Sequence, residues 1–330
     1  MFILNANKLE ELTAYLYQKN WLAPEEEVVE ISVPGDGNMN CVLRIRTSNR
    51  SFIIKQSRDY VEKYPQIAAP EKRVLTEGAF YSKIATVKEI QSVMPSILGI
   101  DAENNLIALE DLGPSNDYTI LYDLEQKMTD LELEQLVHYL NNLHHSFEKT
   151  VVDEELMNTE MRRLNYEHIF EYPFRIDNGF DLDTVQKGLQ DLAIPYKKDT
   201  ILKRKVEQLG TLYLSKGKYL LHGDYYPGSW LNTTKGMKLI DPEFCFYGLR
   251  EFDLGVFLAH LYITEQGEAA ISFVKENYSH LDQLNKNILD GFIGTEIIRR
   301  LIGLAQLPLK MDIQTKSSLL VFARDLILKQ

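Results

Sequence analysis

Residues 219–255 read YLLHGDYYPGSWLNTTKGMKLIDPEFCFYGLREFDLG, and this stretch decides the fold. One short apolar run (219–221) precedes His222-Gly223-Asp224, and a second (237–240) ends on Asp241-Pro242-Glu243. Short apolar runs bounded by Gly, Pro and Asp predict two strands, each followed by carboxylates. A carboxylate that orients a hydroxyl, and hard oxygen ligands for Mg²⁺, are what phosphoryl transfer requires.

Size and composition indicate an ordinary globular protein with two lobes. At 330 residues the chain is longer than one core usually supports. Apolar residues make up 45% and charged residues 25%, which are globular values without a sign of disorder. A net charge of -12 argues against nucleic acid as a partner, because nucleic-acid binding normally requires a basic surface. A small anionic ligand is still compatible with this net charge, because a metal ion and a few basic side chains can neutralise the ligand locally.

The sequence predicts a soluble, cytoplasmic protein. Cys41 and Cys245 both lie in apolar, strand-like runs, which is typical of buried thiols and not of a disulfide framework. The chain shows no basic and apolar signal segment, and no apolar run approaches the roughly 18 residues of a membrane span. We therefore expect no membrane partner.

Alternating apolar residues in the first part of the chain predict a small sheet. After an amphipathic helix at 7–20, the pattern indicates three strands, at 28–33, 41–46 and 51–56. The turn between the first two strands contains Gly35, Asp36, Gly37 and Asn38. Two further strands, at 96–100 and 106–109, would complete a five-stranded antiparallel sheet.

This turn and Lys55, at the end of the third strand, predict a phosphate-binding site for ATP. Backbone amides of a Gly-x-Gly turn approach phosphates closely, and a lysine on the third strand neutralises their charge. A helix is expected after Pro70, with the proline in its first turn, and Glu77 on that helix would pair with Lys55. An ordinary hairpin turn and a solvated Glu77 are the open alternatives.

The segment 110–114 reads EDLGP and predicts a hinge between the two lobes. Backbone groups in such a hinge can meet the edge of an adenine ring, and the candidates are the carbonyl of Glu110 and the amide of Leu112. The hinge divides the chain into a nucleotide-binding lobe, 1–112, and a catalytic and substrate-binding lobe, 113–330. The first is rich in strands and the second in helices, so the fold class is α+β.

The second lobe has the periodicity of helices. Thr129 and Glu132 form a capping box before a core helix that ends near Phe147. The stretch 161–174 has no clear period and is expected to be an insert or lid. Further helices are predicted at 177–193, 198–216, 256–264, 269–278, 292–304 and 313–328.

The three carboxylates of the central stretch have separate predicted roles. Asp224, on a tight loop after His222-Gly223, is placed like a general base that takes the proton of an acceptor hydroxyl. Asp241 and Glu243 lie two residues apart at a strand end, where both could reach a Mg²⁺ ion that bridges nucleotide phosphates.

These motifs resemble the aminoglycoside phosphotransferase and choline kinase branch of the protein-kinase-like fold. Within that branch the sequence is most similar to the methylthioribose kinases. Besides Glu77 and the motif at 222–224, the resemblance rests on the segments 35–40, 53–56, 228–229, 240–244, 246–248, 252–255 and 298–305.

The resemblance implies a bilobal kinase that uses MgATP to phosphorylate the anomeric hydroxyl of 5-methylthioribose, a step of methionine salvage. It implies that Ser229 stands where many relatives have a metal-binding Asn. It also implies that Arg299 and Arg300 contact the substrate beside Asp224, for which a surface salt-bridge pair is the alternative. A homodimer is a further implication.

Two other functions stay open. The sequence has Tyr225-Tyr226-Pro227 where the methylthioribose kinases usually have a Leu-His pair, and Leu249-Arg250-Glu251 in place of a small Pro-containing turn. An aminoglycoside or amino-alcohol phosphotransferase of the same fold is therefore one alternative. The other is a nucleotide-binding pseudokinase, which the presence of Lys55, Asp224 and Asp241 disfavours.

Overall fold

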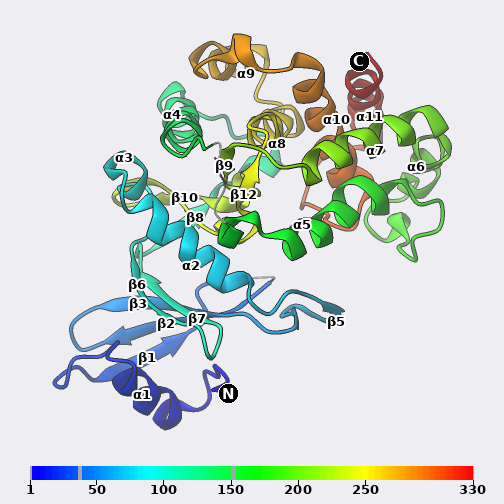
Figure 1. Cartoon of the computed structure of the whole chain (residues 1–330). Coiled ribbons are helices and arrows are strands. Elements are labelled where there is room, and N and C mark those ends of the chain that lie inside the picture. Colours follow the sequence, from blue (N-terminus) through cyan, green and yellow to red (C-terminus); the bar gives the residue numbers. More distant parts are fainter. Residues whose placement is uncertain (1, 36–38, 150–153, 330) are drawn as a thin grey trace. The chain divides into compact units, whose positions relative to one another are not determined.

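The computed structural model describes residues 2–35, 39–149 and 154–329 (Figure 1). The chain divides into two compact units. The first unit comprises Met1–Asn116, Glu154–Met161 and Leu231–Cys245, and the second comprises Asp117–Asp153, Arg162–Trp230 and Phe246–Gln330. The first unit thus ends four residues after the expected boundary at 112 and includes two later segments, which local sequence patterns do not reveal.

The first unit is built on the predicted five-stranded antiparallel sheet, which the structure confirms. Its strands run in the order β1 (Val28–Ser32), β2 (Cys41–Thr47), β3 (Ser51–Gln56), β7 (Leu106–Glu110) and β6 (Ile97–Asp101). All four neighbouring pairs are antiparallel. Period-two alternation explains the two faces: Ile54 belongs to the core under the first helix, and Lys55 points to the other side.

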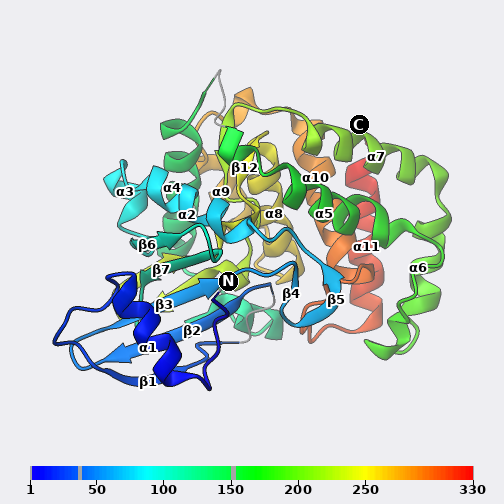
Figure 2. The ribbon, with the colours of Figure 1, turned by 60° about the horizontal axis from the view of Figure 1, so that its bottom comes forward.

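Two helices cover opposite faces of this sheet (Figure 1). Helix α1 (Leu9–Gln18) lies across β1–β3 and buries Leu12, Tyr15 and Leu16 against the sheet (Figure 2). Helix α2 (Arg73–Ile84) packs on the other face, where Gly78 lets the helix approach Ile100 and Ile107. Pro70 is not in the first turn of α2 as expected, because the helix begins three residues later.

Several smaller elements accompany the five-stranded sheet and its two helices. They are the α3 helix (Lys88–Gln91), the hairpin of β4 (Tyr60–Val61) and β5 (Tyr64–Ala68), and the three-stranded sheet of β11 (Gly236–Leu239), β10 (Trp230–Thr233) and β8 (Ser115–Asp117). The β4–β5 hairpin was not expected from the sequence. Within the central stretch, 219–255, β9 (Tyr219–Leu221) and β12 (Phe246–Gly248) form an antiparallel pair.

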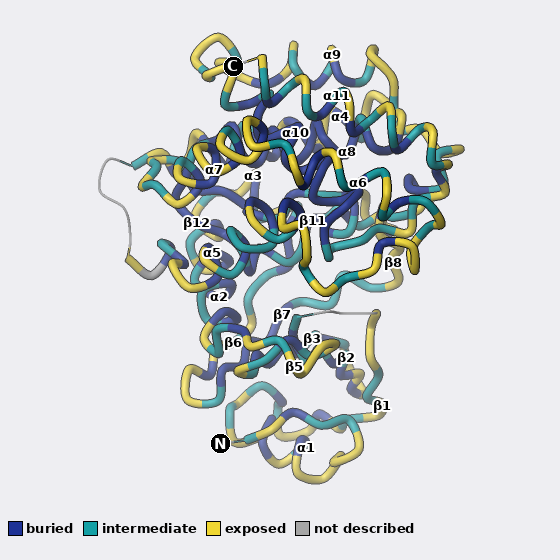
Figure 3. The backbone as a smooth tube through the Cα atoms, turned by 90° about the vertical axis from the view of Figure 1, so that its right-hand side faces the viewer, coloured by how far each residue is buried: buried dark blue, intermediate teal, exposed yellow. Residues whose placement is uncertain are grey.

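The second unit is mostly helical. Its helices are α4 (Asp130–Ser146), α6 (Leu189–Lys198), α7 (Thr200–Leu214), α8 (Glu251–Ile263), α9 (Glu268–Asn277), α10 (Lys286–Ile302) and α11 (Ile313–Leu328), and α5 (Thr159–Tyr166) begins in the first unit and ends in the second. The capping box of Thr129 and Glu132 is present at the start of α4. Figure 3 shows α8 and α10 as buried helices, which form the core of this unit.

The sequence prediction was wrong at 177–193. There α6 begins only at Leu189, because Asp and Asn side chains bind nearby backbone N–H groups and favour turns over a helix. Gly179 and Gly188 adopt positive φ angles in this segment. The expected lid at 161–174 is instead α5 followed by a π-helix at Glu167–Glu171 and a 3₁₀ turn at Tyr172–Phe174.

Within the described residues, none of the helices is both long and apolar enough to cross a bilayer.

The packing of α10 on α11 gives a prediction about stability. A Cβ atom on Gly294 would lie 2.4 Å from the backbone oxygen of Ala323, so Gly294→Ala forces the two helices apart. We expect a loss of about 1–3 kcal/mol in the free energy of unfolding, the usual range for overpacking. Urea denaturation measures it. Gly35→Ala is the control, since nothing lies within 4 Å of that Cβ position, and equal stability of the two variants would contradict the prediction.

Candidate active site

Lys55 forms the predicted ion pair with Glu77 in the first unit. On β3 it pairs with Val42 and Ile107 and faces the side covered by α2. Its Nζ lies 2.8 Å from Glu77 Oε1 and also contacts Asp241 Oδ1. Burial lowers the pKa of Lys55, but the carboxylates of Asp241 and Glu77 outweigh this effect and raise it above its usual value. Lys55 is therefore a charged ammonium.

A tight turn after β11 leaves the side chain of Asp241 partly exposed and that of Glu243 buried. Asp241 has φ 63° and ψ 50°, a left-handed conformation that Asp tolerates better than most residues. It leaves the side chain 44% exposed next to Lys55. Glu243 is buried in the following 3₁₀ turn, Pro242–Phe244, and accepts a hydrogen bond from Asn40 Nδ2 at 2.9 Å. Burial, together with the carboxylates of Glu77 and Asp241, raises the pKa of Glu243 to about 8.

Arg73 is a buried member of this site that sequence reasoning missed. Its guanidinium donates to the backbone carbonyls of Met39 (2.5 Å), Arg58 (2.5 Å), Tyr60 (3.1 Å) and Pro70 (2.9 Å). Its Nε lies 3.8 Å from Glu243 Oε2. Arg73 therefore ties the start of α2 to the segment that follows the glycine-rich turn. We call Lys55, Arg73, Glu77, Asp241 and Glu243 the lysine cluster.

The composition of the lysine cluster fits a divalent cation. Three carboxyl groups lie beside two cations, and burial together with the neighbouring carboxylates raises the pKa of Glu243. Mg²⁺ is usually bound through one or two protein carboxylates together with nucleotide phosphates. In the part of the chain that the structure describes, no group of three or more His, Cys, Asp or Glu side chains is arranged as a metal site by itself. Phosphate oxygens would thus have to supply the remaining ligands.

The predicted nucleotide contacts are only partly described. Asp36, Gly37 and Asn38 lie outside the described residues, whereas Gly35 has no atom within 4 Å of its Cβ position. Glu110 ends β7, and its N–H donates to the carbonyl of Ser96 at 2.8 Å. Leu112 follows in a half-buried position of the expected hinge. There Arg44 makes a two-pronged ion pair with Asp111, at 2.8 and 2.9 Å.

In the second unit, a buried carboxylate holds the loop that carries Asp224. Asp253, in the first turn of α8, is 0% exposed and accepts from the N–H groups of His222 (2.7 Å) and Gly223 (3.0 Å). Gly223 has φ 84°, which turns the chain sharply before Asp224. The hydroxyl of Ser229 donates to the carbonyl of Asp224 at 2.9 Å and closes the loop on its other side. Asp253 lies in the sequence motif 252–255, but the motif does not reveal this role.

Arg299 and Arg300, near the end of α10, are buried and not a surface pair. They are 8% and 5% exposed, and both bind Glu296: Arg299 Nη1 at 2.9 Å and Arg300 Nε at 2.6 Å. Arg300 Nη2 lies 3.5 Å from Asp224 Oδ1, and its guanidinium covers the ring of Tyr226 at 4.6 Å. Glu296 stands three and four residues before the arginines, a spacing that could have revealed it. We call Asp224, Glu296, Arg299 and Arg300 the arginine cluster.

The departures from the methylthioribose kinase pattern serve packing at three positions. Tyr225 is buried, stacks on Tyr139, and donates to the carbonyl of Leu136 at 2.9 Å. Arg250 covers the ring of Tyr219 at 4.7 Å. Glu251 accepts from the N–H of Asn285 at 3.0 Å.

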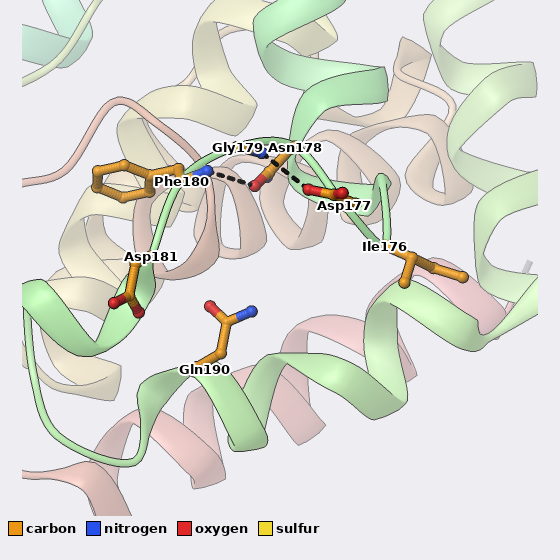
Figure 4. Close-up of a pocket in the computed structure, with 7 residues that line it drawn as sticks. All are labelled: Ile176, Asp177, Asn178, Gly179, Phe180, Asp181 and Gln190. Atoms are coloured by element: carbon orange, nitrogen blue, oxygen red, sulfur yellow. Dashed lines mark hydrogen bonds between the residues drawn. The ribbon is translucent and has the colours of Figure 1, made fainter.

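A pocket of about 300 Å³ elsewhere in this unit contains none of the predicted site residues. Figure 4 shows it between the loop at 176–181 and Gln190 of α6. Its loop is held by its own side chains, since Asp177 and Asn178 accept from the N–H groups of Gly179 and Phe180. These bonds explain the turn and indicate no ligand.

Comparison of the sequence with known proteins shows which of them this chain is similar to. The model of a family described as "Phosphotransferase enzyme family" matches residues 30–284. A methylthioribose kinase of Exiguobacterium sibiricum is 29% identical and covers 82% of this chain and 79% of its own length. A methylthioribose kinase of Bacillus cereus is 27% identical, with coverages of 94% and 88%.

Two solved structures share the fold at low identity. The choline kinase LicA of Streptococcus pneumoniae is 12% identical, with a TM-score of 0.53 and coverages of 97% of this chain and 100% of its own. An AMP-bound spectinomycin phosphotransferase is 16% identical, with a TM-score of 0.52 and coverages of 97% and 99%. They confirm the predicted fold class.

The loop anchor gives a second prediction. Asp253→Asn replaces one acceptor oxygen by an NH₂ group, which faces a backbone N–H and leaves it unsatisfied. We expect a loss of about 1–3 kcal/mol in the free energy of unfolding, together with slower phosphoryl transfer. Thermal unfolding and an ATP-consumption assay measure both effects. Asp282→Asn, at an exposed position, is the control; a variant Asp253→Asn as stable as this control would contradict the anchoring role.

Proposed function

Because the chain belongs to the phosphotransferase enzyme family, as its motifs predicted, we propose that it is an ATP-dependent kinase for a small sugar. The acceptor is 5-methylthioribose and the phosphorylated group is its 1-hydroxyl. The similarity to two methylthioribose kinases supports this substrate. The observation that carries the proposal is Arg300, a buried guanidinium 3.5 Å from the carboxylate of Asp224.

We assign the nucleotide to the first unit. Lys55 binds phosphate oxygens and neutralises their charge, which its ammonium state supports. We assign Gly35, Asp36, Gly37 and Asn38 to phosphate binding, and Glu110 and Leu112 to the adenine edge. Asp241, Glu243 and Ser229 are the residues that would hold Mg²⁺. When bound, Mg²⁺ neutralises the charge that develops on the transferred phosphoryl group.

We assign the acceptor to the second unit, where Asp224 is the general base. Its carboxylate accepts the proton of the acceptor hydroxyl as the oxygen attacks the γ-phosphorus. The guanidinium of Arg300, 3.5 Å from this carboxylate, holds the side chain in place for the acceptor. Asp253 supports this role because it fixes the backbone just before Asp224.

The charge of the arginine cluster favours a neutral sugar over a cationic acceptor. Two guanidiniums balance the carboxylates of Asp224 and Glu296 in a largely buried place. An aminoglycoside or an amino alcohol carries positive charge, and this balanced cluster has no excess of carboxylates to bind it. The hydroxyl groups of a neutral sugar can accept hydrogen bonds from the guanidinium donors.

An acceptor panel tests the function directly. The purified protein is assayed with MgATP and 5-methylthioribose, other pentoses, aminoglycosides and amino alcohols. We expect 5-methylthioribose to have the highest kcat/KM, by at least about 100-fold over any cationic acceptor. A cationic acceptor as the best substrate would overturn the sugar assignment, and no turnover of any acceptor would favour the pseudokinase. The homodimer and the cytoplasmic location stay predictions.

Replacement of the proposed base gives a further prediction. Asp224→Asn keeps the size of the side chain but cannot accept the proton, so kcat on the best acceptor should fall by about 10²–10⁴-fold. The dissociation constant for MgATP, measured by calorimetry, should change little. Asp130→Asn at the exposed start of α4 is the control. A kcat of Asp224→Asn close to the original value would show that another group is the base.

A further inference from the structure

A chain of three buried polar side chains leads to the arginine cluster. The hydroxyl of Tyr122 lies 3.0 Å from His260 Nδ1, and His260 Nε2 lies 3.3 Å from Glu296 Oε1. Tyr122 and His260 are both 0% exposed. Neither has a role in the proposed transfer reaction. Buried polar groups of this kind require an explanation, since apolar side chains of the same volume would fill the space at lower desolvation cost.

The protons of this chain can be assigned from its chemistry. Burial alone would raise the pKa of Glu296, but Arg299 and Arg300 hold it well below its usual range, so its carboxylate only accepts. His260 Nε2 must then carry a hydrogen, and Nδ1 accepts the hydrogen of Tyr122. Burial lowers the pKa of His260 to about 4, which agrees with a neutral ring. The bonds therefore run in one direction, from Tyr122 through His260 to Glu296.

Glu296 is the point at which this chain meets both arginines. Its Oε1 accepts from His260 and Arg300, and its Oε2 accepts from Arg299. Because all three donors share one carboxylate, each restricts where the carboxylate can lie. Long arginine side chains have several rotatable bonds and lose order without such partners.

His260 supports Arg300 by a second route. The ring of Tyr226 packs on the imidazole of His260, with ring centroids 5.5 Å apart. The guanidinium of Arg300 lies over the same tyrosine ring, 4.6 Å from its centroid. A change at His260 therefore affects two contacts of Arg300, the bond to Glu296 and the stack on Tyr226. Both contacts orient the guanidinium that faces Asp224.

We propose that Tyr122, His260 and Glu296 form a positioning network that fixes the guanidiniums of Arg299 and Arg300 for binding of the acceptor. This inference rests on the proposed function, in which the arginine cluster binds a sugar. The three residues act on the acceptor through the guanidiniums of Arg299 and Arg300. Their effect is on the binding of the acceptor, and MgATP binding is independent of them.

The kinetic test compares two substitutions of one residue. Gln keeps an N–H donor for Glu296, whereas Leu fills the space without one. We expect His260→Leu to raise the KM for the acceptor by at least about 10-fold, with His260→Gln within about 3-fold of the original. The KM for MgATP should change by less than about 2-fold in both. His138→Leu, on the exposed face of α4, is the matched control.

A second test needs no acceptor. Phenylglyoxal modifies arginine side chains, and peptide mass spectrometry measures its rate at each position. We expect His260→Leu and Glu296→Gln to be modified at Arg299 and Arg300 at least about 5-fold faster than the original protein and His260→Gln. Arg204, on the surface of α7, should react at the same rate in all of them.

The two tests separate failure of the network from failure of the proposed function. Unchanged labelling rates together with equal acceptor KM values for His260→Leu and His260→Gln would overturn the network. If the original protein phosphorylates no acceptor, the proposed function fails and labelling alone decides: faster labelling supports the network and unchanged labelling overturns it. If His260→Leu does not fold, Glu296→Gln is compared with the original protein in the same way.

Discussion

The two hydrogen bonds that Asp253 accepts from the backbone of His222 and Gly223 determine where Asp224 can lie. The carboxylate is fully buried, so its charge has to be matched by these N–H groups and by His144 Nε2 at 3.4 Å. Because Asp253 belongs to the first turn of the buried helix α8, its hydrogen bonds fix the loop before Asp224 to that helix. The loop that carries Asp224, the general base that we propose, is thereby fixed to the core of its unit.

The charges of the two clusters support the separate roles that we propose for them, nucleotide binding for the lysine cluster and acceptor binding for the arginine cluster. The lysine cluster contains more acidic groups than basic ones, which suits a metal ion that arrives with the nucleotide. The arginine cluster is balanced, and its guanidiniums suit an acceptor that has hydroxyl groups and no charge of its own. In each cluster a basic side chain meets two carboxylates: Lys55 in the first, and Arg300 in the second.

Local patterns predicted what depends on local chemistry. The alternation around Lys55 gave its strand and the pair with Glu77, and the period of α11 gave its bounds, 313–328. The family resemblance located Arg299 and Arg300 but not their burial. Contacts between distant segments were missed because no local pattern records them. Arg73 binds carbonyls up to 34 residues away, and Asp253 binds N–H groups 30 and 31 residues away. At 177–188, side chains that cap turns overrode an apolar period that suggested a helix.

We propose that Lys55 and Asp224 act in one phosphoryl transfer to a sugar. A crystal structure with a non-hydrolysable ATP analogue, Mg²⁺ and 5-methylthioribose tests it most directly. We predict that the sugar 1-hydroxyl lies about 3 Å from a carboxylate oxygen of Asp224, within hydrogen-bond reach, and that the Lys55 ammonium contacts phosphate oxygens. A sugar bound with its 1-hydroxyl away from Asp224, or phosphates without contact to Lys55, would contradict the account.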